Sequence, residues 1–353
     1  MPDLSRQLTE QIQTALTDGA RLNIVGGGSK SFMGRALDNV IPLHTGGHSG
    51  IVSYQPVELV LTARAGTRLD EIEQALDEQG QMLSFQAPHY ASGATIGGTL
   101  ACNQSGPARP WWGSVRDQVL GIRLLNGRGE HLRFGGQVMK NVAGYDVSRL
   151  QAGAMGCLGV ITEISLKVMP KPAHVLTLVE EMPVAEAIDT MNRLSTLPKP
   201  LAGACWYDGH LYLRLAGARS AVDATAKQWG YSQLEEGETF WRDLRDHKLD
   251  FFLGDTPLWR FSVKPTAQPV MHEADWLIDW GGAQRWVRAR DELISMAALA
   301  ETLSGKVSLF KGGDRHGEVN HPQATALQSI QQRLKYSFDP KHLFNPGRLY
   351  TWL

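Results

Sequence analysis

The fold is decided by the stretch Val25-Gly26-Gly27-Gly28-Ser29-Lys30-Ser31, which follows a strand-like segment at residues 22–25. Successive glycines let the backbone approach another group closely and let several N–H groups converge on one anion. The two serines can add hydroxyl donors, and Lys30 adds a positive charge. Taken alone, this pattern fits a phosphate-binding loop and an ordinary glycine-rich turn about equally well, so the flanking sequence has to decide.

Two well-known phosphate-binding loops do not fit this stretch. A Walker loop requires G-x-x-x-x-G-K-[ST], and the sequence does not have that spacing. A Rossmann fingerprint requires G-x-G-x-x-G at the start of a helix, whereas Ser31 stands at the last glycine position and residues 32–35 lead into turn and strand signals. A nicotinamide site of the Rossmann type is therefore not expected.

Three more glycine clusters follow along the chain. They are TIGGTLACN at residues 95–103, WGSVRD at residues 112–117 and KNVAGYDVSRLQAGAMGCLGVIT at residues 140–162. So many clusters in one half of a chain are unlikely to be incidental turns, because glycine is costly to order without a group to face. The pattern indicates many backbone amides around one extended anion, and the diphosphate of a dinucleotide fits that description.

In this order the clusters resemble the FAD-binding domain of the vanillyl-alcohol oxidase and p-cresol methylhydroxylase (PCMH) superfamily. The likeness rests on the glycine-rich loop, T-[IV]-G-G, G-S-x-R-D, K-N-x-x-G-Y-D and G-x-x-G-[VI]-[IV]-T, together with N-P-G-R at residues 345–348. It covers residues 20–170 and the C-terminal tail. The resemblance implies an α+β fold: a PCMH-type FAD-binding domain of two α+β subdomains, followed by a cap domain.

The chain also resembles the family of FAD-binding E subunits of bacterial glycolate oxidases. This likeness rests on PHY at residues 88–90, GPARPW at 106–111, LRFGG at 132–136 and LIDWGGA at 277–283, so it extends into the second half. It implies one flavoprotein subunit of a glycolate oxidase (glycolate dehydrogenase) complex that oxidises glycolate to glyoxylate. The implied partners are a second flavin subunit and an iron–sulfur subunit, with electrons passing on to the respiratory chain.

The superfamily resemblance also assigns cofactor contacts residue by residue. It places the diphosphate on the loop from Gly26 to Ser31, and it returns Asn345 to the flavin edge. The full expected set is Gly26, Gly27, Gly28, Ser29, Lys30, Ser31, Pro88, Thr95, Ile96, Gly97, Gly98, Ala101, Gly113, Ser114, Asp117, Gly156, Gly159, Val160, Ile161 and Asn345.

Two departures from the superfamily pattern concern the way in which the flavin is held. Val25 stands where the loop often begins with Arg, and Ser29 and Lys30 stand where covalent members place a His. We therefore expect noncovalent FAD, held by many amide contacts. Losing one such contact is expected to cost about 1–3 kcal/mol, which weakens binding without abolishing it.

Secondary-structure signals divide the chain into three parts. Residues 1–172 form the expected FAD-binding domain, with a first helix that ends at Gly19 and a hairpin that turns at Asn126-Gly127. Pro170 and Pro172 mark its end. Residues 173–335 read as strand, helix, two strands and helix, which is typical of a ferredoxin-like α+β cap domain. Residues 336–353 are expected to return to the flavin domain.

Oxidation of a 2-hydroxy acid needs a cation for the carboxylate and a base for the hydroxyl proton. Arg260 is the candidate cation, and His89 and His316 are the candidate bases, although each of the three fits a structural role equally well or better. Relatives in the lactate and glycolate group carry the metal motif H-x-x-G-D-G-N-x-H. The nearest string here, KGGDRHG at residues 311–317, lacks the first His and the Asn, so no catalytic metal is expected.

Composition argues against several other classes of protein. The 353 residues are 42% hydrophobic and 20% charged, which is typical of a globular protein. The net charge is −1 and the basic residues are dispersed, which argues against nucleic-acid binding. The three cysteines form no C-x-x-C pair and fit a reducing, cytoplasmic setting. No apolar run reaches about 18 residues, so any membrane association is expected to be peripheral.

Three functional hypotheses remain open at this point. The first is a flavin subunit that relays electrons or supports assembly, because the degenerate histidine motif leaves hydride transfer to the other flavin subunit. The second is a self-sufficient dehydrogenase for another D-2-hydroxy acid, such as D-lactate. The third is a non-catalytic scaffold that has lost its cofactor, against which the glycine clusters argue.

Overall fold

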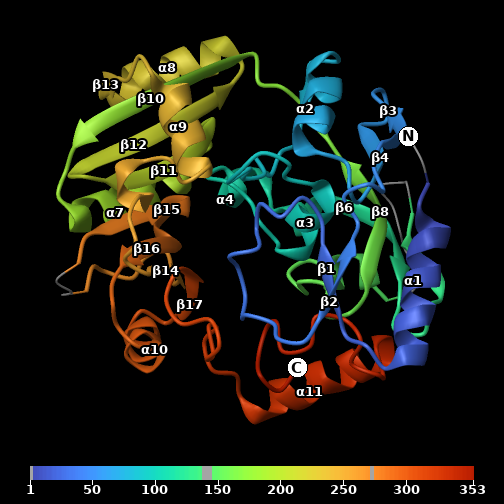
Figure 1. Ribbon diagram of the computed structural model, residues 1–353. Helices are drawn as coiled ribbons and strands as arrows, with labels where there is room; N and C mark the ends of the chain where they lie inside the picture. The colour runs from blue at the N-terminus through green and yellow to red at the C-terminus, as the bar shows by residue number, and fades with distance from the viewer. Residues whose placement is uncertain (1–2, 137–144, 271–273) are drawn as a thin grey trace. The chain divides into compact units, whose positions relative to one another are not determined.

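The chain folds into two units that are each built from helices and sheets (Figure 1). The computed structural model describes residues 3–136, 145–270 and 274–353. The first unit comprises Met1–Ser105, Ser114–Pro170 and Asp314–Leu353, and the second comprises Gly106–Gly113 and Lys171–Gly313. Residues 140–144 of the K-N-x-x-G-Y-D motif lie outside the described residues.

The first unit contains most of the glycine clusters. Its elements, in chain order, are α1 (Ser5–Asp18), β1 (Leu22–Val25), β2 (Ile41–His44), β3 (Ile51–Gln55), β4 (Val60–Arg64), α2 (Leu69–Asp77), β5 (Gln81–Met82), α3 (Ile96–Ala101), α5 (Val115–Gln118), β6 (Val119–Leu125), β7 (His131–Gly135), α6 (Val147–Leu150), β8 (Val160–Lys167), β9 (Met169–Pro170) and α11 (Thr325–Phe338).

Two hydrophobic cores give the first unit its two α+β subdomains. One core lies on a five-stranded antiparallel sheet in the order β3-β4-β8-β6-β7, against which α2 and α3 pack. The other joins α1 to the parallel pair β1-β2 and to the C-terminal tail through Leu343 and Phe344. Strand β8 serves both cores, since Ile161 belongs to the first and Val160 to the second.

Helix α1 shows how local sequence sets an element of the second core. Leu8, Ile12 and Ala15 recur at helical spacing, and all three are buried. The helix ends at Gly19, whose φ of 65° is the left-handed conformation that glycine adopts without strain. This ending is the one that the sequence predicts.

The second unit is built on an eight-stranded antiparallel sheet in the order β13-β10-β12-β11-β15-β16-β14-β17. Its elements are α4 (Arg109–Trp112), β10 (His174–Glu181), α7 (Val184–Ser195), β11 (Leu201–Tyr207), β12 (His210–Gly217), α8 (Arg219–Trp229), β13 (Ser232–Gln233), α9 (Gly237–Arg245), η1 (Asp250–Phe252), β14 (Leu258–Ser262), β15 (Trp276–Asp279), η2 (Trp280–Gly282), β16 (Gln284–Arg288), α10 (Leu293–Thr302) and β17 (Lys306–Lys311).

The ferredoxin-like arrangement is present in this sheet. Strands β10, β11, β12 and β13 stand in the spatial order fourth-first-third-second, with α7 and α8 as the two crossovers. Strands β14 to β17 form a second set with the same order read in the opposite direction along the sheet. The two sets of four strands meet where β11 pairs with β15, each of which is the second strand of its set. The sequence pattern shows no such repeat, because the described part of the connection from β14 to β15 contains no helix.

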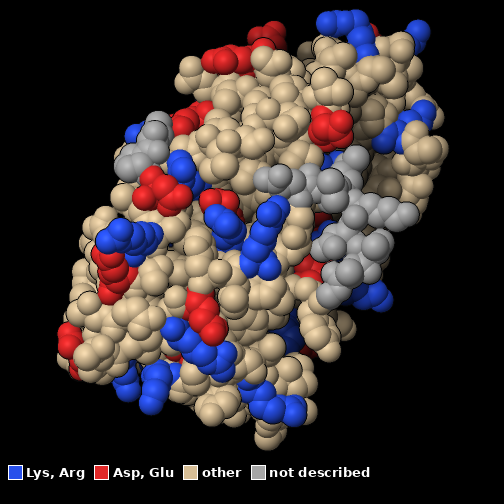
Figure 2. All heavy atoms as spheres, turned by 90° about the vertical axis from the view of Figure 1, so that its right-hand side faces the viewer, with Lys and Arg blue, Asp and Glu red and all other residues tan. Residues whose placement is uncertain are grey.

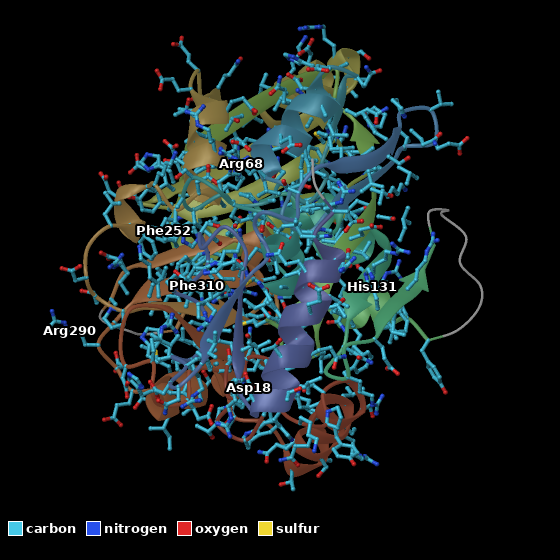
Figure 3. All side chains as sticks on the ribbon, turned by 45° about the vertical axis from the view of Figure 1, so that its right-hand side comes forward. Asp18, Arg68, His131, Phe252, Arg290 and Phe310 are labelled. Atoms are coloured by element: carbon cyan, nitrogen blue, oxygen red, sulfur yellow. The ribbon has the colours of Figure 1, made fainter. Side chains whose placement is uncertain are left out.

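One half-buried histidine, His247, lies in an aromatic cluster of the second unit. The ring of His247 stacks on Phe252 with centroids 3.9 Å apart, and Phe310 lies 5.3 Å away; both phenylalanines are labelled in Figure 3. Burial lowers the pKa of His247 to about 3. The histidine is therefore neutral in the folded protein at ordinary pH.

The structure differs from the sequence-based expectations in two places. The returning segment begins at Asp314, not at residue 336, because α11 packs within the first unit through the buried Lys335. The spacing of Thr67 and Asp70 in the sequence also indicates a capping box, which the structure does not form. The Thr67 hydroxyl instead accepts from the amide of Gly50 at 2.8 Å, and Arg68 is the N-cap of α2.

Charged side chains are mixed on the face that Figure 2 draws, where Lys and Arg alternate with Asp and Glu over the surface. This dispersion fits the net charge of −1. None of the helices in the described ranges is both long enough and apolar enough to cross a membrane.

Candidate functional site

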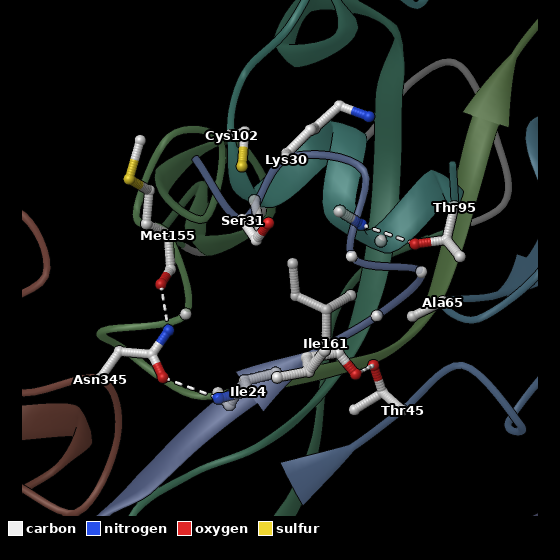
Figure 4. A pocket seen from close by; sticks show the side chains of 18 of the residues that line it. Ile24, Lys30, Ser31, Thr45, Ala65, Thr95, Cys102, Met155, Ile161 and Asn345 are labelled. Atoms are coloured by element: carbon white, nitrogen blue, oxygen red, sulfur yellow. Dashed lines mark hydrogen bonds between the residues drawn. The ribbon is translucent and has the colours of Figure 1, made fainter. Parts of the chain in front are cut away.

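A deep cavity in the first unit brings three of the glycine clusters together (Figure 4). Its empty space is about 890 Å³, which includes the part that is open to solvent. The cavity is lined by the loop after β1, the start of α3, the segment before β8 and the C-terminal tail. Residues from both ends of the chain therefore share one binding site.

The loop from Gly26 to Ser31 supplies backbone donors to this cavity. The amides of Gly27, Gly28 and Ser29 donate no hydrogen bond to any residue in the described ranges. Gly27 also packs so tightly that a Cβ atom there would lie 1.6 Å from the carbonyl oxygen of Gly93. The loop can thus hold its shape only with glycine at this position, and its spare donors suit an anion.

The second glycine cluster, at residues 95–103, lines the same cavity as the loop from Gly26 to Ser31. The Thr95 hydroxyl caps α3 by accepting from the Gly98 amide at 3.2 Å, and the Gly97 amide donates to the Ala65 carbonyl at 2.8 Å. These bonds fix Gly97 and Gly98 in the cavity wall at the positive end of the helix dipole. Thr95 also meets Gly26, where an added Cβ would lie 2.8 Å from the threonine hydroxyl.

The charged residues of the cavity lining are all cationic. Lys30 and Arg348 line the cavity, and the described lining contains no Asp or Glu. Among the described residues, the Arg348 guanidinium donates only to carbonyl oxygens, those of Arg35 at 2.9 Å and Ser31 at 3.0 Å. Burial lowers the pKa of Arg348 from its usual value, which is the sign of a cation that is short of compensating negative charge. The cavity is therefore suited to a ligand with at least one negative charge.

The tail closes the cavity through Asn345. Its side-chain oxygen accepts from the Ile24 amide at 2.8 Å, and its side-chain nitrogen donates to the Met155 carbonyl at 2.6 Å (Figure 4). A backbone bridge between Leu22 and Phe344 adds the tail alongside β1. One asparagine thus joins three segments that are far apart in the sequence.

Many of the residues expected at the cofactor site do line the cavity. They are Gly26, Gly27, Gly28, Ser29, Lys30, Ser31, Thr95, Gly97, Gly98, Ala101, Gly156, Gly159, Ile161 and Asn345.

Six expected residues do not line it, for identifiable reasons. The side chains of Ile96 and Val160 are fully buried in the hydrophobic cores. Ser114 and Asp117 bond to each other in a capping box at α5, with the Ser114 hydroxyl 2.7 Å from the Asp117 carboxylate. The other two are Gly113, which belongs to the second unit, and Pro88, which is buried elsewhere.

The sequence reasoning missed several residues of the lining. Arg348 is the last residue of the N-P-G-R motif, and Cys102 lies within the cluster at residues 95–103. The positive charge of Arg348 could have indicated that it faces an anionic cofactor. Thr45 and Ala65 carry no signal, because only the pairing of distant strands brings them to the loop. The missed residues are Asn23, Ile24, Val25, Met33, Thr45, Ala65, Cys102, Met155 and Arg348.

The described cavity lining contains one thiol, that of Cys102, which is partly exposed. Desolvation raises the pKa of Cys102 above its usual value, and the positive charges of Lys30 and Arg348 offset this only in part. Cys157 is buried, and burial raises its pKa to about 11. Both thiols stay protonated near pH 7, which fits a packing role.

The three candidate catalytic residues are not brought together in the cavity. His89 bonds to Glu73, with its Nε2 atom 3.1 Å from the carboxylate. His316 is largely exposed and lies 3.6 Å from the Asp38 carboxylate. Neither histidine lines the cavity. Arg260 belongs to the second unit, where its guanidinium lies 5.8 Å from the centre of the Trp280 ring.

The same unit joins two of the segments that carry the closer resemblance. The Trp280 indole N–H donates to the Gly106 carbonyl at 3.0 Å, and the Arg109 guanidinium lies 4.5 Å from that ring. Residues 106–111 and 277–283 therefore pack against each other in the folded chain. Among the described residues, no group of three or more His, Cys, Asp or Glu side chains could hold a metal ion.

This fold and this cavity define an FAD-binding oxidoreductase subunit of the PCMH type, and the sequence family described as "FAD binding domain" matches residues 1–135. The chain is 44% identical over 352 residues to glycolate oxidase subunit GlcE of Escherichia coli, covering 99% of each chain. It therefore belongs to the GlcE family of glycolate oxidase subunits.

Other relatives match parts of the chain or its fold. Glycolate oxidase subunit GlcD of Bacillus subtilis is 34% identical over 130 residues, which are 36% of this chain and 27% of that relative. An alkyldihydroxyacetonephosphate synthase structure superposes with a TM-score of 0.68, covering 98% of this chain and 76% of that chain at 14% identity. The second likeness concerns the fold alone.

Proposed function

We propose that the chain is the FAD-bearing subunit of a multi-subunit complex that oxidises glycolate to glyoxylate. The full-length similarity to subunit GlcE supports this proposal. The observation that carries it is the cavity, in which three unused amides and two cations face a space that is lined by no acid within the described residues.

The residues present fit noncovalent FAD. The amides of Gly27, Gly28 and Ser29 and the charges of Lys30 and Arg348 would meet the diphosphate, and Asn345 and the segment around Gly156 would border the ring system. In the part of the chain that the structure describes, the lining contains no His that could form a covalent link to a flavin. When bound, a flavin supplies the ability to accept a hydride and to pass electrons on singly.

The composition of the described cavity lining supports a division of labour within the complex. Removal of the hydroxyl proton of a 2-hydroxy acid needs a base within hydrogen-bond reach. The described lining contains no His, Asp or Glu, and its thiol is held protonated. A second flavin subunit, similar to GlcD, would therefore transfer the hydride. This subunit would relay electrons to an iron–sulfur subunit and onward to the respiratory chain.

The first experiment uses the purified full chain. A yellow protein with a flavin spectrum that glycolate does not bleach, but that loses its colour when the partner flavin subunit and glycolate are added, would support the relay. Rapid bleaching by glycolate alone, or by D-lactate alone, would overturn it in favour of a self-sufficient dehydrogenase. A folded but colourless chain that ignores added FAD would contradict the flavin assignment itself.

The second experiment concerns partners and place. Affinity purification of the tagged chain from cells, followed by mass spectrometry, should recover a second flavoprotein and an iron–sulfur protein. Recovery of neither would contradict the proposed complex. Fractionation should place the chain in the cytoplasm, with any membrane-bound part released by salt, because its attachment would be peripheral and through partners.

A further inference from the structure

Lys335 is a lysine of α11 with no exposed surface, and each of its three N–H bonds has an acceptor. The ammonium donates to the Cys157 carbonyl at 2.7 Å, to the Phe344 carbonyl at 2.7 Å and to the Asp339 carboxylate at 2.8 Å. An ammonium has three donors, so this lysine is fully satisfied. Two of its three N–H bonds donate to backbone carbonyls, those of Cys157 and Phe344, that are far apart in the sequence.

Asp339 extends this arrangement into the tail. It is fully buried, and its two carboxylate oxygens accept from the amides of Leu343 at 2.9 Å and Phe344 at 2.8 Å. The lysine and the aspartate therefore hold the chain around Phe344 from both its amide and its carbonyl side. A buried ion pair is not needed for stability as such, since apolar side chains of similar size often serve equally well.

The Cys157 and Phe344 carbonyls, which accept from Lys335, lie next in sequence to residues of the cavity wall. Cys157 directly follows Met155 and Gly156, and Phe344 directly precedes Asn345. Met155, Gly156 and Asn345 line the cavity, whereas Cys157 and Phe344 do not. Met155 and Asn345 have φ values of 46° and 42°, a left-handed conformation that costs energy for Met and that Asn adopts more readily. The Asn345 side chain donates to the carbonyl of the strained Met155.

Strained backbone persists only where the surrounding structure over-determines it. We infer that Lys335 is a positioning residue for the cofactor: it pins the Met155–Cys157 and Phe344–Asn345 segments together, and so keeps the flavin side of the cavity in its binding shape. This inference rests on FAD binding by the cavity, and it does not depend on glycolate as the substrate.

The test separates positioning from simple stabilisation. Lys335→Met alone leaves the Asp339 carboxylate buried without its cation, which is expected to destabilise the protein. The decisive variant is therefore Lys335→Met/Asp339→Asn, which removes both charges and keeps an acceptor for one of the two tail amides, those of Leu343 and Phe344. The matched control is Arg6→Met/Glu10→Gln, which removes an exposed ion pair of the same i,i+4 spacing in α1.

The dissociation constant for FAD and the visible circular dichroism of the bound flavin are measured for each full-length protein, with thermal unfolding of the FAD-free forms alongside. The double variant at Lys335 should bind FAD roughly 10- to 100-fold more weakly, as expected for the loss of one or two buried hydrogen bonds, and its flavin dichroism should change. The Arg6/Glu10 control should match the parent protein in both readouts.

Parent-like affinity and dichroism in a folded double variant would overturn the inference. Should the variant not fold, hydrogen exchange of the parent protein decides. Equal protection of the amides at residues 155–158 and 343–345 supports a common pin, and clearly different protection contradicts it. Failure of the parent chain itself to bind FAD would contradict the FAD assignment, which distinguishes that outcome from failure of the present inference.

Discussion

Replacing Arg348 by Met tests the electrostatic design of the cavity most directly. The substitution keeps a long, flexible side chain and removes the cation that lines the site, together with its hydrogen bonds to the Arg35 and Ser31 carbonyls. A hydrogen bond that involves a charged group contributes about 1.5–3 kcal/mol. Each 1.4 kcal/mol is about a tenfold change in a dissociation constant. We therefore expect FAD to bind about 10- to 100-fold more weakly.

The assay is titration of the FAD-free full chain with FAD, followed by flavin fluorescence and checked by calorimetry. Arg348→Lys is the matched variant: it keeps the charge and loses the forked geometry, so it should recover part of the affinity. Arg6→Met, at a side chain that is 92% exposed, should leave binding unchanged. A dissociation constant for Arg348→Met within twofold of the parent value would refute the reasoning that this cation faces the anionic cofactor.

Further outcomes are expected elsewhere. Gly27→Ala should eliminate FAD from the purified protein, measured as the ratio of flavin to protein absorbance, because the new Cβ would lie 1.6 Å from the Gly93 carbonyl; normal flavin content would contradict this. Asn345→Leu should lower the thermal midpoint and weaken FAD binding by about tenfold, since two hydrogen bonds in the cavity wall are lost; an unchanged affinity would count against it. His247→Phe should make unfolding less sensitive to acid. The folded pKa of His247 lies near 3 and its ordinary value is 6.5, so the unfolded chain takes up the proton first and stability is lost as pH falls below about 6.5. Urea unfolding at pH 7 and pH 5 measures this, and an equal loss in both proteins would exclude the explanation.

The sequence predicts those parts of the site that depend on local chemistry. A run of glycines after a strand indicates spare amides whatever surrounds it, and the structure places Gly26 to Ser31 in the cavity wall. Helix α1 is equally local, since a helical apolar repeat decides it. The hairpin of β6 and β7 is also present, but its left-handed residue is Gly129, with a φ of 75°, and not Asn126 or Gly127. The ferredoxin-like order of β10 to β13 follows from the succession of elements.

What the sequence could not provide depends on contacts between distant segments. Thr45 and Ala65 reach the cavity only because β1 pairs with β2 and because the Ala65 carbonyl accepts from Gly97. The opposite error arises at Ile96 and Val160, which sit inside glycine motifs while their side chains point into the cores. A motif indicates where the backbone passes close to the ligand. It does not indicate whether the side chain of a given residue points towards the ligand or into the core.

The cavity is assembled from residues 23–31 and residues 345–348, and the whole second unit is encoded between them. During synthesis at roughly 5–20 residues per second, the nascent chain displays its glycine loop long before the ribosome reaches Asn345. The cavity wall is therefore complete only when translation is almost finished. A chain truncated before its tail would lack the wall that Asn345 and Arg348 provide.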